Sequence, residues 1–558
     1  MTRRLIVIGA GMASGRMLEH LFDAGFEGHV TLFNAEPRGN YNRLMLSPVL
    51  SGEKTYDQIV THDDAWYAAH SVDCRFGEAV VRIDRERKVV VSKAGETPYD
   101  TLVIATGSAP FIIPVPGKDL PGVVTYRDLE DTNAMIAAAK PGAKAVVIGG
   151  GLLGLEAAAG MAARGAEVTV IHLMGHLMER QLDPAAGYLL QRDLEARGIR
   201  VHCKGATKAI LGKDRVEAVL LEDGTVYDAD LVCMAVGIRP ETRIATDAHL
   251  DIGRGITVND QMQTSDPAIH ALGECVEHDG QLFGLVAPLY DQARVLAATL
   301  MGQEAAFRPV QTATKLKVTG VDLFSAGDFA EAPGREDIVF RDPGRGVYKR
   351  LVLEGEKLIG AVMYGDTADG AWFFDKIKTG EDVTEIRDTL IFGPAFQGGT
   401  QADPLAAVAA LPPEAEICGC NGVCKGKIVT AVEGGAHTLD AGRVTTRASA
   451  SCGTCTRLVK KVMALTLGNI FRPTPNPPMC KCTDHTHEEV RRLIKAQGLK
   501  SIPAVMQELG WKTSGGCASC RPALNYYLLS DWPMDYRDDR QSDRKSTRLN
   551  SSHEWISR

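Results

Sequence analysis

Two short apolar runs, each leading into a glycine-rich turn, organise the first half of the chain. Residues 5–8 are Leu-Ile-Val-Ile and residues 145–148 are Ala-Val-Val-Ile, and runs of this kind predict strands buried on both faces. An amphipathic segment and a second apolar run follow each turn, which predicts two βαβ units of an α/β fold. The residues that set the two turns are Gly9, Gly11, Ser14, Gly149, Gly151 and Gly154.

The glycine turns have the chemistry of dinucleotide sites. Glycine lets the backbone approach a pyrophosphate, and the amides that open the next helix bind that anion. The second strand of the first unit ends at Glu36, where a carboxylate can hold an adenosine ribose. The second unit has His172 there and Arg180 nearby, so it can accept NADPH as well as NADH. Two motifs in one chain favour two dinucleotides over glycine turns without a ligand.

These motifs resemble the two-dinucleotide flavoprotein reductases, which bind FAD at the first glycine turn and NAD(P)H at the second. Residues 99–107, 230–237 and 264–274 are similar to further segments of that family. The resemblance implies that Thr106 and Gly107 close the FAD site and that Glu274 lies at the flavin ribityl chain, where the family more often has aspartate. It also implies that a helix with Pro288 in its first turn faces the flavin.

The route by which electrons leave the flavin must differ from that of the disulfide reductases with this architecture. Those enzymes carry a reactive cysteine early in the chain, whereas residues 41–48 contain no sulfur nucleophile and Cys74 is isolated. We therefore expect electrons to pass to a bound acceptor or to metal centres on the chain itself.

Eight of the thirteen cysteines form two copies of one pattern, a Cys-x-Cys pair followed by a Cys-x-x-Cys pair. Four thiolates suit an iron–sulfur cluster or a tetrahedral zinc. Redox-inert zinc would leave the electrons without an exit, so the pattern favours iron. Each copy resembles the [2Fe-2S] domain of bacterioferritin-associated ferredoxin. The predicted ligands are Cys418, Cys420, Cys452, Cys455, Cys480, Cys482, Cys517 and Cys520.

Residues near these quartets have other expected roles. Cys424 has no counterpart in the second copy and is predicted to be a bystander, and His485 and His487 are predicted to be solvated residues at a helix start. Thr486 and Glu489 form a capping box that predicts this helix.

Composition restricts the class of protein. The net charge is −8 with acidic and basic residues interleaved, which leaves no basic stripe for nucleic acid. No apolar run approaches the roughly 18 to 20 residues that span a bilayer. Residues 5–8 are too short a run for a signal peptide. We expect a cytoplasmic enzyme, where reduced thiols are available for cluster assembly.

The predicted fold is an α/β two-dinucleotide flavoprotein reductase with two Rossmann-like domains, an α+β cover and dimerisation domain, and two small helical iron–sulfur domains. The expected spans are 1–117 with 246–305 for FAD, 118–245 for NAD(P)H, 310–395 for the cover, and 415–470 and 478–530 for the clusters.

This domain order resembles the N-terminal part of the large subunit of bacterial assimilatory NAD(P)H nitrite reductases, over residues 1 to 542. The resemblance implies that sirohaem and a [4Fe-4S] cluster belong to a C-terminal part that this chain lacks. Residues 543–558 resemble translated adapter DNA, so we expect a non-native tail on a truncated gene model. A small nitrite reductase subunit and a second copy of the chain are candidate partners. The alternatives are an electron-transfer subunit of assimilatory nitrate reductase and a zinc-bearing redox sensor or scaffold.

Overall fold

The computed structural model describes residues 3–309, 311, 313–318, 320–394, 408–409, 411–418, 421–450, 453, 455–468, 478–480, 482–513, 515–517, 520–533 and 535–537. The proposed tail at 543–558 lies outside these residues. The chain divides into two compact units, one of residues 1–435 with 442–466 and one of residues 436–441 with 467–558. No helix in the described part combines the length and apolarity needed to cross a membrane.

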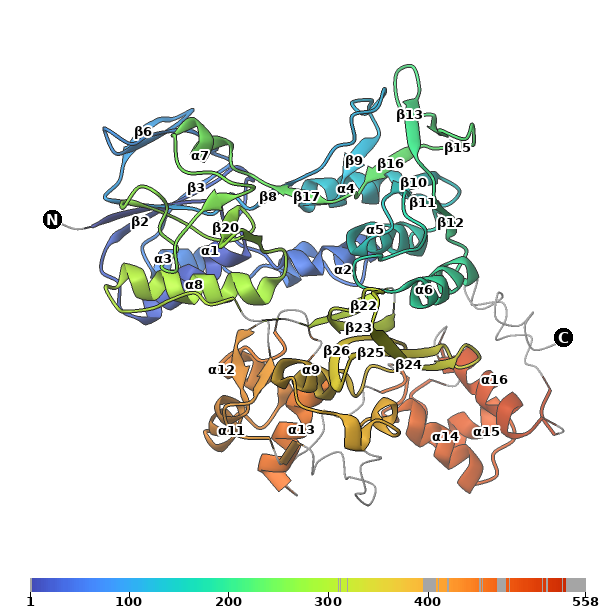
Figure 1. The fold of residues 1–558 in the computed structure, drawn as a ribbon. Helices are drawn as coiled ribbons and strands as arrows, with labels where there is room; N and C mark the ends of the chain where they lie inside the picture. The colour runs from blue at the N-terminus through green and yellow to red at the C-terminus, as the bar shows by residue number, and fades with distance from the viewer. Residues whose placement is uncertain are drawn as a thin grey trace. The chain divides into compact units, whose positions relative to one another are not determined.

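A parallel five-stranded sheet forms the first module, in the order β19-β7-β1-β2-β3. Two of its strands, β2 and β3, are labelled in Figure 1. Its strands are β1 (Arg4–Ile8), β2 (His29–Asn34), β3 (Asp73–Phe76), β7 (Thr101–Ile104) and β19 (Ile269–Ala271). The apolar run of β1 is buried after its first residue, as expected for a central strand. Helices α1 (Met12–Asp23) and α8 (Val286–Leu300) pack against each other beside this sheet.

The second module repeats this design with the order β12-β11-β10-β16-β9. Its elements are β9 (Val123–Thr125), α4 (Leu129–Ala138), β10 (Lys144–Ile148), α5 (Leu152–Ala163), β11 (Glu167–His172), α6 (Pro184–Ala196), β12 (Arg200–Cys203) and β16 (Leu231–Met234). An antiparallel sheet of β13 (Thr207–Leu211), β14 (Ala218–Leu221) and β15 (Val226–Asp228) accompanies it. The segments that connect the two modules pair as β8 (Ser108–Pro110) and β17 (Ile238–Pro240).

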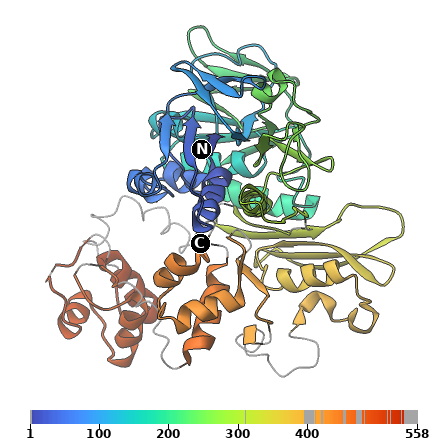
Figure 2. The same cartoon turned by 90° about the vertical axis from the view of Figure 1, so that its left-hand side faces the viewer.

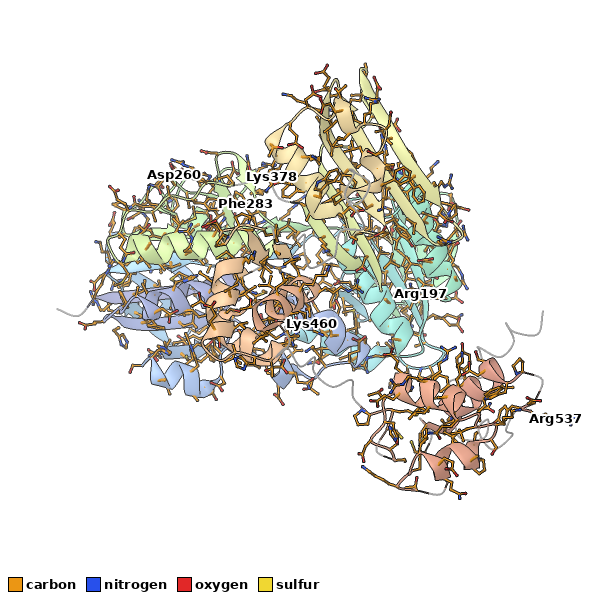
Figure 3. All side chains as sticks on the ribbon, turned by 90° about the horizontal axis from the view of Figure 1, so that it is seen from below. Arg197, Asp260, Phe283, Lys378, Lys460 and Arg537 are labelled. Atoms are coloured by element: carbon orange, nitrogen blue, oxygen red, sulfur yellow. The ribbon has the colours of Figure 1, made fainter. Side chains whose placement is uncertain are left out.

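Shorter elements complete the first module. They are α2 (Leu46–Ser51), α3 (Asp64–Ala69), β4 (Val80–Asp84), β5 (Val89–Ser92), β6 (Gly95–Pro98), α7 (Arg243–Asp247), β18 (Ile256–Thr257), β20 (Val276–His278) and β21 (Gln281–Leu282). The chain beyond α8 is held by Phe307, whose ring centroid lies 5.3 Å from that of Phe283. Phe283 is labelled in Figure 3.

An antiparallel sheet follows, in the order β22-β23-β26-β25-β24, with α9 against one face (Figure 2). Its elements are β22 (Thr314–Val318), β23 (Val321–Gly327), β24 (Arg335–Asp342), β25 (Val347–Glu354), β26 (Lys357–Tyr364) and α9 (Gly370–Thr379). Phe373 of α9 is fully buried with Phe324 and Leu351 of the sheet, so the core of this domain lies between helix and strands.

The cysteine-rich segments are mainly helical. The first contains β27 (Glu416–Cys418), β28 (Val423–Cys424), α11 (Lys425–Glu433), α12 (Leu439–Thr446) and α13 (Thr456–Leu467). The second contains α14 (His487–Ala496), α15 (Ile502–Glu508) and α16 (Cys520–Asp531), which enclose Val490, Val505 and Leu524. The predicted capping box at the start of α14 is confirmed, because Thr486 and Glu489 each receive the other's backbone amide.

Candidate dinucleotide and cluster sites

The first glycine turn leaves room for a phosphate where the sequence predicts one. Gly9 has φ +109°, and a Cβ there would lie 2.3 Å from the carbonyl oxygen of Ala105, so only glycine fits. A Cβ on Gly11 would meet no atom within 4 Å. The turn is therefore tight on its strand side and open at the start of α1, which fits a pyrophosphate.

Ser14 takes the place of the third glycine without disturbing this turn. Its side chain is fully buried, and its one hydroxyl hydrogen is shared between the carbonyl oxygens of Gly9 at 2.6 Å and Gly11 at 3.0 Å. The hydroxyl therefore ties the first turn of α1 to the loop that it follows.

The second turn has the same form with a glycine at the third position. Gly149 has φ +125°, and a Cβ there would lie 2.2 Å from the carbonyl oxygen of Ala235. A Cβ on Gly151 would meet nothing within 4 Å, whereas one on Gly154 would lie 2.0 Å from the carbonyl oxygen of Gly149. Gly154 thus permits the close packing of α5 on its strand, and Gly151 faces open space.

The helices that start at the predicted cofactor sites have no side-chain cap. α1, α5 and α8 begin after Gly11, Gly151 and Leu285, and none of these residues caps the helix with a side-chain hydrogen bond. In contrast, Asp128 and Asp183 cap α4 and α6. Uncapped amides at a helix start are available to an anionic ligand, so these three ends fit phosphate or flavin groups.

Glu36 and His172, at the end of the second strand of each module, make different contacts. Glu36 lies just beyond β2, where its carboxylate accepts the Tyr41 hydroxyl at 2.9 Å and pairs with Arg43. His172 is buried at the end of β11, where its Nδ1 accepts the Gly150 amide at 3.0 Å and its Nε2 lies 3.1 Å from Glu179. His172 therefore holds the glycine turn itself. Arg180 is exposed.

The remaining predicted FAD residues come together near α8. Glu274 accepts the Ser108 hydroxyl at 2.6 Å and pairs with Arg127. The Thr106 hydroxyl donates to the carbonyl oxygen of Glu241 at 2.6 Å, and Gly107 has φ +69°.

Helix α8 starts at Val286, so Pro288 lies in its first turn as predicted. Fully buried Gln292 of α8 accepts the Gly273 amide at 2.8 Å and so joins the helix to the Glu274 segment. Sequence reasoning missed Arg127 and Ser108, because neither lies in a recognisable motif.

The isolated cysteines do not form a thiol relay in the described part of the chain. Burial raises the pKa of Cys74 to about 11 and that of Cys233 to about 12, which keeps both thiols protonated. Cys275 is fully buried and Cys203 is half-buried. This chemistry agrees with an electron route that uses no thiol nucleophile.

The second cysteine quartet forms a compact cluster of sulfur atoms. The Sγ atoms of Cys480, Cys482, Cys517 and Cys520 all lie within 4.8 Å of one another. The indole nitrogen of Trp511 donates to the Cys520 sulfur at 3.5 Å, and backbone amides donate to the sulfurs of Cys480 and Cys520. Burial raises the pKa of Cys480 to about 12, so a bound cation is needed to hold four thiolates here.

Only half of the first quartet can be described, because Cys420 and Cys452 lie outside the described residues. The Cys418 sulfur receives the Ser449 amide at 3.4 Å and the Asn421 side-chain amide at 3.5 Å. A hydrogen bond from Cys455 and these amide donors outweigh burial and lower the pKa of Cys418 to about 6. The site therefore favours a thiolate at neutral pH.

The neighbouring candidate ligands have other contacts. Cys424 is the residue that precedes α11. His487 Nδ1 lies 2.7 Å from the Tyr527 hydroxyl, and His485 Nδ1 lies 3.9 Å from Glu489. These contacts support their predicted roles away from the metal, which remain predictions.

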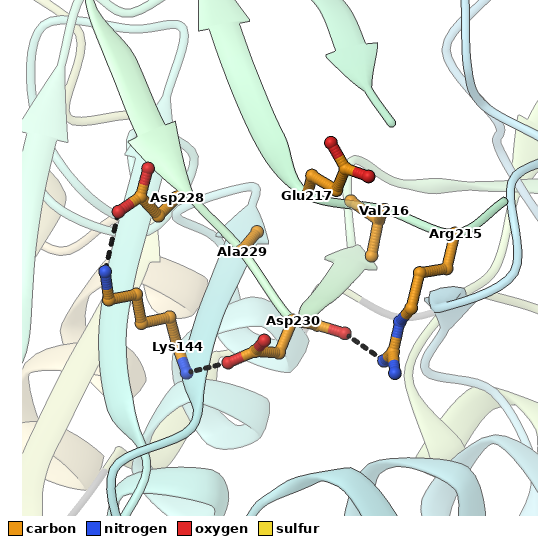
Figure 4. Close-up of a pocket in the computed structure, with 7 residues that line it drawn as sticks. All are labelled: Lys144, Arg215, Val216, Glu217, Asp228, Ala229 and Asp230. Carbon is orange, nitrogen blue, oxygen red and sulfur yellow. Dashed lines mark hydrogen bonds and ion pairs between the residues drawn. The ribbon is translucent and has the colours of Figure 1, made fainter. Parts of the chain in front are cut away.

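A pocket of about 360 Å³ on the second module does not coincide with the nucleotide site (Figure 4). Lys144 at the start of β10 and Asp230 before β16 line it, and Lys144 Nζ pairs with Asp228 at 2.6 Å. These are the amino-terminal ends of the strands, whereas dinucleotides bind at the carboxyl ends. The pocket therefore does not test the prediction that the nucleotide binds at the Gly149 turn.

Comparison with known proteins agrees with this geometry. The model of the pyridine nucleotide-disulphide oxidoreductases matches residues 3–302, that of the rubredoxin NAD+ reductase C-terminal domain matches residues 313–381, and that of the BFD-like [2Fe-2S] binding domain matches residues 416–464 and 478–530. A nitrite reductase [NAD(P)H] from Bacillus subtilis is 45% identical over 99% of this chain and 68% of its own length. The chain belongs to the NAD(P)H nitrite reductase family of pyridine nucleotide-disulphide oxidoreductases.

This NAD(P)H nitrite reductase family member also matches two other relatives, and it spans a different share of the length of each. An assimilatory nitrate reductase electron transfer subunit from Bacillus subtilis is 37% identical over 95% of this chain and 68% of its own length. The nitrite reductase (NADH) large subunit of Escherichia coli is 36% identical over 95% of this chain, which spans 63% of that protein.

A solved structure supports the fold of this NAD(P)H nitrite reductase family member. The NAD-dependent persulfide reductase from A. fulgidus has 27% identity and a TM-score of 0.64, covering 69% of this chain and 78% of its own. The predicted family and fold class are confirmed. The chain is an NAD(P)H-dependent flavoprotein oxidoreductase with BFD-like [2Fe-2S] domains, which favours iron–sulfur clusters over zinc.

Proposed function

We propose that the chain is the electron-input part of a nitrite reductase, with two [2Fe-2S] clusters as the exit from its flavin. The observation that carries this proposal is the pairing of a two-dinucleotide reductase with two cysteine quartets, in a chain whose residues 41–48 contain no sulfur nucleophile. Bound FAD would take a hydride from NAD(P)H and release its electrons singly to the clusters.

The chain's own residues bind and orient these groups. In the proposed assignment, Gly149, Gly151 and Gly154 hold the NAD(P)H pyrophosphate at the start of α5, while His172 fixes the turn. Uncapped α8, with Pro288 in its first turn, offers its positive dipole end to the negative charge of reduced flavin. The proposed FAD contacts are Gly9, Gly11, Ser14, Glu36, Thr106, Gly107, Glu274 and Pro288.

Two clusters follow from two complete cysteine quartets. The sulfur geometry of Cys480, Cys482, Cys517 and Cys520 supports one of them. The amide donors on Cys418, its side-chain hydrogen bond with Cys455 and the two BFD-like matches support the other, with Cys420 and Cys452 as its remaining ligands.

The terminal acceptor is proposed from the relatives. Nitrite reductase [NAD(P)H] gives the higher identity, so we favour nitrite, reduced to ammonium at a sirohaem and [4Fe-4S] part outside this chain. The match to an assimilatory nitrate reductase electron transfer subunit supports nitrate as the alternative. A small nitrite reductase subunit and a homodimer formed through residues 310–395 are the proposed partners.

Anaerobic purification with cofactor analysis tests this proposal. We expect one FAD and about four iron atoms per chain, with both clusters giving electron paramagnetic resonance signals after reduction by NADH or NADPH. Zinc after cluster reconstitution, or only two iron atoms per FAD, would contradict the two-cluster assignment. Adding a separately produced sirohaem domain and measuring ammonium from nitrite would then distinguish nitrite from nitrate as the acceptor.

A further inference from the structure

Helix α1 of the first module contacts the first cluster segment through two charged residues on one face. Arg16 Nη2 donates to Asn421 Oδ1 at 2.5 Å, and Glu19 pairs with Arg447. Arg16 and Glu19 also pair with each other at 2.9 Å. A single turn of α1 therefore holds two separate points of the cluster segment.

Glu19 lies at the centre of this contact and is buried. Its side chain is 9% exposed, and its carboxylate lies 2.7 Å from His62 Nε2. Burial alone would raise its pKa, but hydrogen bonds from His62 and Arg447 and the charges of Arg16 and Arg447 lower the pKa to about 2. The Arg447 side chain is 44% exposed, but the Glu19 carboxylate is buried, and a buried carboxylate that loses a partner is costly.

The other end of the contact reaches a proposed cluster ligand. Asn421, which accepts from Arg16, donates its side-chain amide to the Cys418 sulfur, and Ser449, two residues beyond Arg447, donates its backbone amide to the same sulfur. Arg447 and Ser449 have φ of +61° and +65°, a conformation that non-glycine residues rarely adopt without support from surrounding contacts.

The same face of α1 also reaches the proposed flavin site. The Arg16 guanidinium lies over the ring of Tyr290 at 4.5 Å, and Tyr290 is two residues beyond Pro288 at the start of α8. Arg16 thus touches both the helix assigned to the flavin and the asparagine that contacts Cys418. A simple surface ion pair between Glu19 and Arg447 would not require Arg16 to contact both of these segments.

We propose that Glu19 and Arg447 are positioning residues that dock the first cluster segment on α1, which makes the first cluster the direct acceptor of electrons from FAD. The second cluster then receives its electrons from the first. This inference rests on the proposed function, because it states which of the two proposed clusters receives electrons from FAD first.

Cysteine variants of the full, cofactor-loaded chain test the order. Cys455→Ser removes a ligand of the first cluster, and Cys517→Ser removes a ligand of the second. With NADH or NADPH and rapid freezing, we expect the cluster left in Cys517→Ser to be reduced at the original rate. The cluster left in Cys455→Ser should be reduced at least tenfold more slowly, although dithionite still reduces it. Equal rates in both variants would overturn the proposed order.

Docking variants test the positioning residues. In Arg447→Ala and Glu19→Gln we expect reduction of the first cluster to slow at least tenfold, its midpoint potential to shift, and residues 443–450 to exchange amide hydrogens faster. Arg447→Lys should restore part of the rate. Flavin bleaching by NAD(P)H should stay within twofold of the original, because α5 and the Gly149 turn are unchanged. Arg457→Ala, at an exposed position on α13, is the matched control.

The outcomes separate the two proposals. If Arg447→Ala and Glu19→Gln match Arg457→Ala in rate, potential and exchange, the docking inference is wrong. If Arg447→Ala loses the first cluster during purification, Glu19→Gln decides, because Glu19 lies outside the cluster segment. If NAD(P)H reduces no cluster in the unaltered chain, the proposed function itself fails.

Discussion

The Ser14 hydroxyl donates a 2.6 Å hydrogen bond to the carbonyl oxygen of Gly9, across the turn assigned to the FAD pyrophosphate. In the second module the corresponding position is Gly154, where any Cβ would lie 2.0 Å from the carbonyl oxygen of Gly149. The first turn is therefore slightly wider than the second and is held by a side chain instead of by direct backbone packing.

Ser14→Ala should weaken FAD binding several-fold, because the buried carbonyl oxygen of Gly9 loses a hydrogen bond worth about 1 kcal/mol. Ser14→Val should weaken it further, since a methyl group would replace the hydroxyl between two carbonyl oxygens. Fluorescence titration of the apoprotein with FAD measures the affinity. Ser51→Ala is the control, because it removes a hydroxyl-to-carbonyl bond at the end of α2. Equal affinities for Ser14→Ala and Ser51→Ala would contradict this role.

Gly11→Val and Gly151→Val should separate the two dinucleotide sites. Both glycines have ordinary φ values of −84° and −82° and open space at Cβ, so the fold should tolerate valine while the pyrophosphate space is filled. Gly11→Val should purify without FAD. Gly151→Val should retain FAD that dithionite reduces but NAD(P)H does not. The flavin absorbance spectrum reports both results, and loss of FAD from Gly151→Val would show that the sites are wrongly assigned.

Cys517→Ser should leave the first stage of electron transfer intact. The serine removes one of four sulfurs that lie within 4.8 Å of one another, so the second cluster should be damaged. NAD(P)H should still bleach the flavin at the original rate, and reduction of ferricyanide should survive at least in part. Stopped-flow absorbance measures the bleaching. Loss of flavin reduction with FAD still bound would contradict the proposed electron path from nucleotide to flavin to clusters.

His270 on β19 should make the first module less stable in mild acid. Burial, with a smaller contribution from Arg3, lowers the pKa of His270 from 6.5 to about 4. Between these values the unfolded chain binds the proton and the folded chain does not, so the free energy of unfolding falls as pH falls from 6.5 towards 4. The expected loss is about 2 kcal/mol at pH 5.

Urea unfolding followed by flavin fluorescence between pH 5 and pH 7.5 measures this loss. His270→Gln should flatten the pH dependence whatever its effect at neutral pH, because it removes the titrating group. His29→Gln, at the exposed start of β2, should keep the original slope. An unchanged slope in His270→Gln would assign the acid sensitivity to another group.

The sequence by itself determined the parts whose chemistry is local. The apolar runs at residues 5–8 and 145–148 predicted central strands, and the glycines after them are required by backbone geometry within a few residues. The two cysteine patterns and the capping box at Thr486 are likewise complete within short segments. Together with the family resemblances that they carry, these features predicted the fold class and the cofactors without any knowledge of packing.

Only the tertiary structure brought together residues that are distant in the chain. Glu274 and Arg127, and Glu19 and Arg447, become partners because strands and helices fold next to each other, and no spacing rule connects them. The role of His172 also depended on the fold, since its side chain turns inward to the Gly150 amide. Motifs encode local backbone geometry, whereas the partners of a buried charge are set by which surfaces pack together.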